Sequence, residues 1–319
     1  MFTDAAPHLI VPFASCSGDD WLQAMSSTPL RNLGQLLRGM KVLDTDVGQA
    51  DSLSPPHERV LAKALGLPAS ADGLIPWAAY EAHANCHEGW AVITPCHWAM
   101  GREHATLTDP ATLELNDNDS RALLAAMQPY FATEGITLQY LQATRWLARG
   151  DVFASLPTAS LDRVLGRNVD RWLPSLKQIK LLQNEMQMLL YTHPINDERA
   201  SHRQRSINSF WVSGSGALIE PARANIHVNN HVNTHVRTSR ALAQAALAND
   251  WAAYAQAWTE LDASDIAQLL IQQNSGNTVR ISLCGESQCM TFETAQNGLL
   301  TKIRHALRPQ PAIHVLQQL

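Results

Sequence analysis

The stretch NEMQMLLYTHPINDERASHRQRSINSFWVSGSG, residues 184–216, guides the interpretation of the whole chain. It begins as the end of an amphipathic helix and breaks at His193-Pro194, because the residue before a proline disfavours helical geometry. A polar segment follows, and an apolar aromatic run then ends in Gly-Ser-Gly. A helix followed by a strand with a glycine turn is ordinary architecture. A polar loop held between two buried elements is also a common place for a binding site, so both interpretations stay open.

Arg199 is the residue of this stretch whose chemistry points most directly to a ligand. A planar guanidinium binds a phosphate or carboxylate through two parallel hydrogen bonds, which lysine cannot reproduce. We therefore predict that Arg199 contacts an anion, with internal pairing to Asp197 or Asp162 as the structural alternative. The other candidate ligand-binding residues of the stretch are His193, Asn196, Asn208, Trp211, Gly214 and Gly216.

A second group of arginines precedes this stretch. Arg163, Arg167 and Arg171 are spaced four residues apart, so a helix would align them on one face that could gather a phosphate or carboxylate. The alternative is a solvated face that pairs with Asp162 and Asp170. Asp162, Arg163 and Arg167 are therefore added to the candidate ligand-binding residues.

Composition restricts the classes of protein that this chain can belong to. With 319 residues, 45% hydrophobic and 17% charged, it can bury a full core as one large domain or two intimate ones. A net charge of -5 argues against nucleic acid or an anionic membrane surface as the main partner. The short first apolar run has no preceding Lys or Arg, and no later run reaches the length of a membrane span. Five scattered cysteines without a C-x-x-C suit reduced thiols, so we expect a cytoplasmic location.

The apolar pattern predicts a mixed α/β protein whose central sheet is flanked by helices. Residues 1–103 are expected to form the N-terminal part of this core, 104–150 an inserted α+β lobe, and 151–319 the remainder, with the site motifs at 151–216. The cleft between lobe and core is the expected site. We also expect buried strands at 8–15, 89–98 and 278–285, helices at 30–40, 58–65, 177–191, 251–261 and 298–307, and a loop at 44–54.

Two histidine patterns raise the question of a metal. Cys86-His87 and Cys96-His97 match no zinc spacing, and both residue types are common on buried strands and turns. His227, His231 and His235 repeat every four residues, which places them on one face of either a helix or a strand. The asparagines and valines between them favour a polar loop, so we expect these histidines to be dispensable.

The polar motifs carry a resemblance to a known family. From about residue 107 to Gly216 the chain resembles the substrate-binding half of the archaeal-type cofactor-independent phosphoglycerate mutases, which are alkaline-phosphatase-like metalloenzymes. As a whole it more closely resembles the bacterial regulatory proteins called RpfE type. The matching residues are Thr158, Asp162, Gly166, His193, Pro194, Asn196, Arg199, Asn208, Trp211, Gly214 and Gly216. Leu161 and Ser213 stand where the mutases have a histidine and a second tryptophan.

The resemblance implies a fold related to these mutases but leaves their reaction open. Such enzymes need an aspartate and a serine nucleophile at the first strand, with further Asp and His residues holding two divalent metals. Here the first strand offers Ser15 and Ser17 but no carboxylate before Asp19. We therefore expect no metal or other cofactor, and a regulatory protein that binds a small phosphorylated or carboxylated metabolite or a protein partner. The alternative is an active mutase-like phosphotransferase with two divalent metals such as Mn²⁺.

Overall fold

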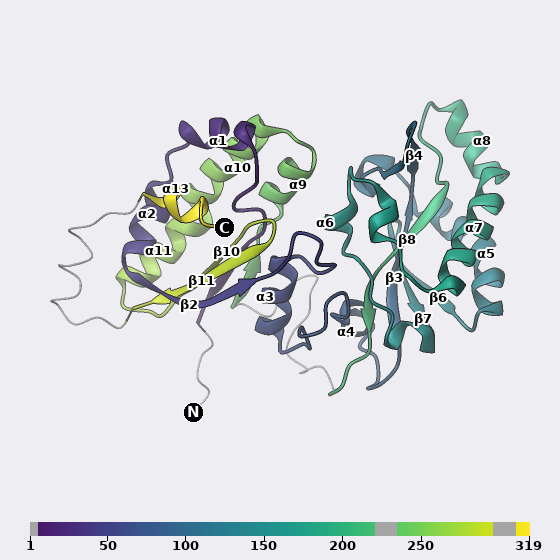
Figure 1. Cartoon of the computed structure of the whole chain (residues 1–319), viewed down its shortest axis with the longest axis horizontal. Coiled ribbons are helices and arrows are strands. Elements are labelled where there is room, and N and C mark those ends of the chain that lie inside the picture. The colour runs from purple at the N-terminus through teal and green to yellow at the C-terminus, as the bar shows by residue number, and fades with distance from the viewer. Residues whose placement is uncertain (1–5, 221–234, 296–310) are drawn as a thin grey trace. The chain divides into compact units, whose positions relative to one another are not determined.

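The computed structural model describes residues 6–220, 235–295 and 311–319, which fall into two α/β units (Figure 1). Of the described residues, the terminal unit consists of 6–51, 55–64, 235–295 and 311–319, and the middle unit of 52–54 and 65–220. Each contains a sheet flanked by helices, which confirms the predicted mixed α/β class. Among the described residues, no helix is long and apolar enough to cross a bilayer.

A five-stranded sheet organises the terminal unit, in the order β2-β11-β10-β1-β9. β1 lies between β9 and β10 and runs parallel to both, whereas β10, β11 and β2 pair antiparallel. The carboxyl end of β1 therefore meets the turn between β10 and β11. The strands are β1 (His8–Val11), β2 (Met40–Val47), β9 (Val236–Thr238), β10 (Arg280–Cys284) and β11 (Gln288–Thr294).

Both faces of this sheet are covered. Leu9 and Val11 of β1 belong to the large core beneath the helices, while Ile10 points to the other face and packs with Val60 of α3 (Pro56–Leu65). Burial on both faces explains why this strand reads as an unbroken apolar run in the sequence. The helices on the core side are α1 (Asp19–Ser26), α2 (Arg31–Arg38), α9 (Ala241–Leu247), α10 (Trp251–Leu261), α11 (Ala267–Asn274) and α13 (Ala312–Leu316).

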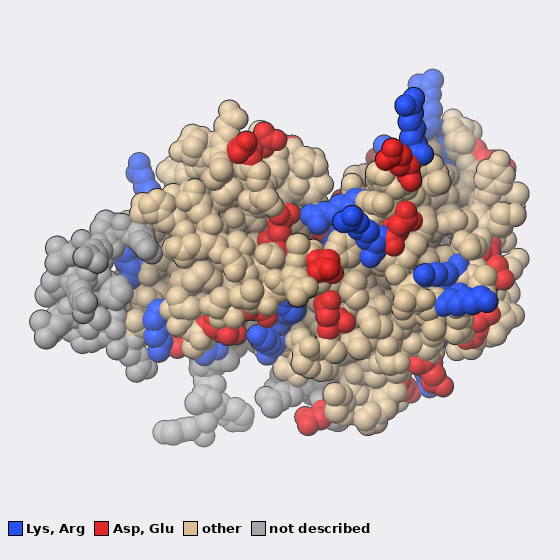
Figure 2. Space-filling model, in the orientation of Figure 1, with Lys and Arg blue, Asp and Glu red and all other residues tan. Residues whose placement is uncertain are grey.

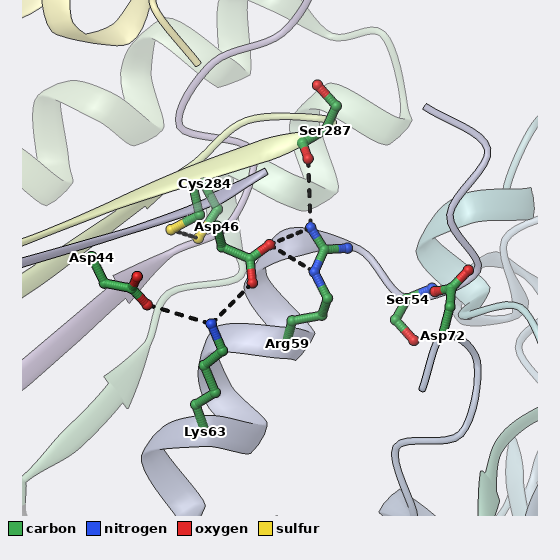
Figure 3. A network of polar contacts seen from close by, with 9 residues as sticks. Asp44, Asp46, Ser54, Arg59, Lys63, Asp72, Cys284 and Ser287 are labelled. Atoms are coloured by element: carbon green, nitrogen blue, oxygen red, sulfur yellow. Dashed lines mark hydrogen bonds and ion pairs between the residues drawn. The ribbon is translucent and has the colours of Figure 1, made fainter. Parts of the chain in front are cut away.

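An ion-pair network attaches α3 to β2 (Figure 3). Arg59 donates from Nε to Asp46 Oδ1 at 2.8 Å, and Lys63 lies 3.3 Å from the other carboxylate oxygen. Burial alone would raise the pKa of Asp46, but the hydrogen bonds and charges of Arg59 and Lys63 outweigh it and lower the pKa. Lys63 also forms an ion pair with the exposed carboxylate of Asp44. This network fixes α3 where apolar contact with the sheet is limited to a few residues.

His8 begins a buried chain of polar side chains on the same sheet. Its Nε2 lies 2.7 Å from Ser282 Oγ, which lies 2.7 Å from Thr291 Oγ1, so the chain crosses three strands. Burial, and then the charge of Arg280, lower the pKa of His8 from 6.5 to about 4. The folded protein therefore holds a neutral imidazole at neutral pH.

Acidification is expected to destabilise the terminal unit through His8. Because its folded pKa lies below the unfolded value, the stabilisation is complete above pH 6.5 and is lost as the pH falls toward 4. We expect a loss of roughly 2–3 kcal/mol on reaching about pH 4.5. Urea unfolding of the wild type and His8→Gln at about pH 7 and about pH 4.5 measures it, since acidic side chains titrate alike in both. Equal pH dependence of the two proteins would contradict the assignment.

A four-stranded antiparallel sheet organises the middle unit, in the order β6-β7-β3-β8. α5 (Asp117–Thr133) and α7 (Lys177–Tyr191) bury one face of it through a core that includes Leu123, Met186 and Trp146. The strands are β3 (Trp90–Cys96), β6 (Thr137–Gln142), β7 (Arg145–Arg149) and β8 (Ser209–Gly216), with a separate pair β4 (Trp98–Met100) and β5 (Ala105–Leu107). The shorter helices are α4 (Trp77–Glu81), α6 (Leu161–Val164) and α8 (Pro194–Ser201).

The described structure divides the chain differently from the predicted boundaries. β6 and β7, inside the expected 104–150 lobe, share one sheet with β3 and β8. That segment thus belongs to the same unit as 65–103 and 151–224, because its hydrogen bonds run to strands on both sides of it in sequence. The expected helix at 298–307 lies outside the described residues.

Two predicted element boundaries were wrong in the terminal unit. The first strand ends at Val11 and not at residue 15, because Phe13 adopts a left-handed conformation with φ 53° that no strand accommodates. The expected loop at 44–54 begins with the second half of β2, which is held by hydrogen bonds to β11 while most of its side chains stay exposed. A strand with exposed faces lacks the apolar alternation that reveals strands in a sequence.

Candidate functional site

The predicted ligand-binding residues near His193 are engaged in local structure. α7 ends at Tyr191, and α8 begins at Pro194 with His193 as its N-cap, whose Nδ1 accepts from Ile195 N at 3.3 Å. Asn196 donates from Nδ2 to Leu190 O at 2.8 Å. These contacts join the two helix ends and satisfy backbone groups that a stopped helix exposes.

The two asparagines act as backbone mimics. Asn196 also pairs with both backbone groups of Ile207, donating to its oxygen and accepting from its nitrogen at 2.8 Å each. Asn208 does the same with Trp98, accepting from its nitrogen at 2.7 Å and donating to its oxygen at 3.0 Å. Each side-chain amide therefore pairs with a backbone segment as a neighbouring strand would.

Arg199 is buried, with 1% of its surface exposed. Its Nε donates to Arg205 O at 2.8 Å and its Nη2 donates to Leu113 O. Burial lowers the pKa of this guanidinium, and the charges of Asp119 and Glu114 act in the opposite direction. The paired hydrogen bonds predicted for an external anion are made to two carbonyl oxygens of the chain itself.

The strand that closes the opening stretch forms part of the framework. Trp211 is fully buried and donates from Nε1 to Ala159 O at 3.1 Å. Gly214 has a φ of 59°, which favours glycine, and a Cβ at Gly216 would lie 3.1 Å from Leu74 O. The glycines therefore let β8 approach neighbouring backbone closely, and this close packing accounts for the Gly-Ser-Gly ending.

The predicted arginine face is not formed. Helix α6 stops at Val164, Gly166 follows with a φ of 68°, and Arg171 lies in a separate 3₁₀ turn, so Arg163, Arg167 and Arg171 do not share one helix. Asp162 and Arg163 are buried, and Arg167 is half-buried. Helix α6 ends early because Leu165 adopts an extended conformation ahead of the left-handed glycine.

The suspected metal pairs do not converge within the described part of the chain. No three His, Cys, Asp or Glu side chains in residues 6–220, 235–295 and 311–319 lie close enough together to hold an ion. Cys96 is fully buried, and burial raises the pKa of its thiol. His97 Nδ1 lies 2.9 Å from Ser206 O. Of the three regularly spaced histidines, His227 and His231 lie outside the described residues.

A cavity of about 480 Å³ lies at the carboxyl end of β1 in the terminal unit. Its walls come from the loop after β1, the first turn of α1, the turn between β10 and β11, and Gln317 and Leu319 after α13. In α/β sheets, ligands characteristically bind beyond the carboxyl ends of parallel strands. The lining residues include Ser15, Cys16, Ser17, Trp21, Glu286 and Ser287.

The loop that forms this cavity is held in a strained conformation. Phe13 has a φ of 53°, uncommon for a bulky residue, and its carbonyl accepts from Tyr254 Oη at 2.7 Å. Trp21 donates from Nε1 to the same hydroxyl at 3.2 Å, and Ala14 N donates to Cys284 O at 2.7 Å. Strained backbone that the surroundings hold in place is frequent at functional sites.

The polar groups of the cavity are already oriented. Ser17 Oγ donates to Glu286 Oε2, and Ser15 is buried at 6% exposure. Gly18 is the N-cap of α1 and supplies no side-chain cap to its first turn. The sequence had indicated Ser15 and Ser17 as possible nucleophiles, but it gave no reason to select Glu286.

The molecular surface shows no single basic region on the face drawn. Lys and Arg side chains are interspersed with Asp and Glu there (Figure 2).

Comparison with known proteins yields likeness in structure only. No family model matches the chain, and no curated protein sequence matches it. The solved cofactor-independent phosphoglycerate mutase from Thermoplasma acidophilum is 11% identical, with a TM-score of 0.37 and 98% coverage of both chains. The PH0037 protein from Pyrococcus horikoshii is 10% identical, with a TM-score of 0.42 and coverage of 98% of this chain and 97% of that one. At these values the likenesses assign neither a family nor an activity.

Proposed function

We propose that the protein is a cytosolic, metabolite-binding regulatory protein whose ligand occupies the cavity beyond β1. The cavity itself supports this proposal most strongly, since its size of about 480 Å³ suits a small molecule. Its floor is a loop fixed by Tyr254 and by the backbone of Cys284. A rigid loop that presents several polar groups is the arrangement that binding sites require.

The lining residues support one class of ligand. Trp21 and Leu22 contribute apolar surface, while Ser15, Ser17 and Ser287 contribute hydroxyl groups. Glu286 accepts a hydrogen bond from Ser17 and lines the cavity with a carboxylate, a group that only accepts hydrogen bonds. Hydroxyl groups on a ligand are donors that suit such a carboxylate.

An acidic group on the ligand fits the N-terminus of α1. This helix starts at the cavity, its N-cap Gly18 supplies no side-chain hydrogen bond to the first-turn amides, and the amides at a helix N-terminus favour an anion. Asp19 and Asp20 oppose this, but both are exposed and solvent screens them. We therefore propose a small hydroxylated acid, phosphorylated or carboxylated, as the ligand.

The regulatory part of the proposal rests on the sequence resemblance to RpfE-type proteins. Ligand occupancy would then be sensed by a protein partner, and no metal chemistry is required of the binding step. Turnover of phosphoglycerate in the presence of added Mn²⁺ tests the mutase alternative directly.

Calorimetric titration of the full chain with 3-phosphoglycerate and with glycerol tests the proposal. The acid is expected to bind and glycerol to bind more weakly. Glu286→Ala is expected to weaken binding of the acid by roughly tenfold to a hundredfold, since a hydrogen bond to a charged group contributes about 1.5–3 kcal/mol. Glu185→Ala removes an exposed carboxylate of the middle unit and serves as the control. Failure of the acid to bind, or equal binding by Glu286→Ala, would refute the proposal.

A further inference from the structure

Cys284 and Cys289 face each other across the β10–β11 hairpin. They are directly opposite in the register of the two strands, their sulfur atoms lie 3.0 Å apart, and both residues are fully buried. Figure 3 shows Cys284 beside Asp46, a member of the network that attaches α3. The sequence does not indicate that these cysteines pair, because four residues separate them and no C-x-x-C is present.

The hairpin geometry suits a disulfide bond between them. Gly285 N donates to Gln288 O at 2.8 Å, so these two residues form a hydrogen-bonded pair and the cysteines occupy the adjacent non-hydrogen-bonded pair. Cα atoms in such a pair are about 4.5 Å apart, which falls within the range of about 4.4–6.8 Å that disulfides span. The sulfurs need to approach by only about 1 Å to reach bonding distance.

We infer that Cys284 and Cys289 form a thiol–disulfide modification site whose oxidant is a peroxide. One thiolate attacks a peroxide oxygen of hydrogen peroxide, which gives a sulfenic acid and, with one proton, a molecule of water. The second thiol then attacks the sulfenic sulfur, the S–S bond forms and a second water leaves. Both thiols are oxidised, one peroxide is reduced, and two waters are the only other products.

Burial sets the rate of this reaction. It raises the pKa of Cys284, and the neighbouring thiol Cys289 raises it further. Because the thiolate is the reacting form, oxidation is slow at neutral pH and accelerates as the pH rises. In a reducing compartment the pair stays reduced, and it responds to sustained oxidant rather than to brief exposure.

The consequence for the cavity rests on the proposed function. Glu286 and Ser287 form the turn between the two cysteines and line the cavity. A disulfide across the base of this turn restricts its motion and shifts the carboxylate relative to Ser17. Oxidation is therefore expected to change affinity for the acid by severalfold, whereas formation of the disulfide requires no ligand.

Mass spectrometry of the full chain tests the site. The folded protein is treated with hydrogen peroxide at about pH 8.5, unfolded in an alkylating agent and digested. We expect the tryptic peptide 281–302, which contains both cysteines, to have lost two hydrogens. Further cleavage after Glu286, which lies between them, is expected to give two fragments that separate only on reduction.

Two variants act as controls. Cys96→Ala removes another fully buried thiol and is expected to form the disulfide as the wild type does. Cys289→Ala is expected to yield no such species and to leave Cys284 alkylated or carrying added oxygen. The inference is overturned if the half-exposed Cys16 and Cys86 are oxidised while peptide 281–302 keeps both thiols. It is equally overturned if the link forms only after unfolding in urea.

Discussion

Replacing Arg199 with methionine is expected to lower the free energy of unfolding by about 3 kcal/mol. Methionine fills much of the same volume but donates no hydrogen bond. The carbonyl oxygen of Leu113 would then lose its donor in a buried position, and the carbonyl oxygen of the exposed residue Arg205 would lose a partly buried hydrogen bond. An unsatisfied buried carbonyl costs about 1–3 kcal/mol, and the loss of the second hydrogen bond adds about 1 kcal/mol.

Urea unfolding followed by far-ultraviolet circular dichroism measures this loss. Arg199→Lys keeps the positive charge but lacks the planar guanidinium that donates to both carbonyl oxygens. An intermediate loss of stability is therefore expected. Arg171→Met removes an exposed arginine of the same unit and is expected to change stability by less than about 0.5 kcal/mol. If Arg199→Met unfolds at the wild-type urea concentration but fails to bind an anion, the ligand role predicted from the sequence is correct and the structural role is not.

Long helices could be predicted from the sequence with little error. The bounds of α7 and α10 agree with the expected 177–191 and 251–261, because apolar residues recur at helical spacing along their buried faces. β2 could not be predicted, since MKVLDTDV is held by backbone hydrogen bonds to β11 and exposes most of its side chains. Backbone hydrogen bonds between strands cannot be recognised in a single sequence when no apolar pattern accompanies them.

The sequence indicated a polar loop between a helix and a strand, but part of that segment is the helix α8, and the hydrogen-bond partners of its side chains could not be predicted. Asn196, Arg199 and Asn208 each bind backbone groups near the junction of α7, α8 and β8. Such junctions expose backbone groups that need partners, and the side chains that satisfy them are the same types that bind small ligands. Residue type alone does not separate the two roles.

The residues that line the cavity could be predicted from the sequence only in part. Ser17 could be selected from the sequence because it follows the first strand, but Glu286 is 269 residues further along the chain. Parallel pairing of β1 with β10 brings the two together, and that register is a property of the folded sheet. Nothing in the sequence identifies a single carboxylate in a hairpin turn as a cavity residue.

Asp262→Ala is expected to cost about 3–4 kcal/mol in the terminal unit. Helix α2 has Leu30 at its N-cap, which supplies no side-chain acceptor. The buried carboxylate of Asp262 takes that role, accepting from Leu33 N at 2.8 Å and from Asn32 N at 3.1 Å. Alanine would leave two amides of the first turn without partners, one of them on a fully buried residue.

The comparison with two other variants separates capping from a general effect of charge. Asp262→Asn keeps one acceptor oxygen but turns an amide group toward a donor, so about half of the loss is expected. Glu260→Ala removes an exposed carboxylate two residues away and should leave stability nearly unchanged. Hydrogen exchange adds a local measurement, because loss of the cap should accelerate exchange in α2 (Arg31–Arg38) before the remainder of the unit opens. Uniform acceleration across both units would show instead that Asp262 acts on global stability and does not cap this helix.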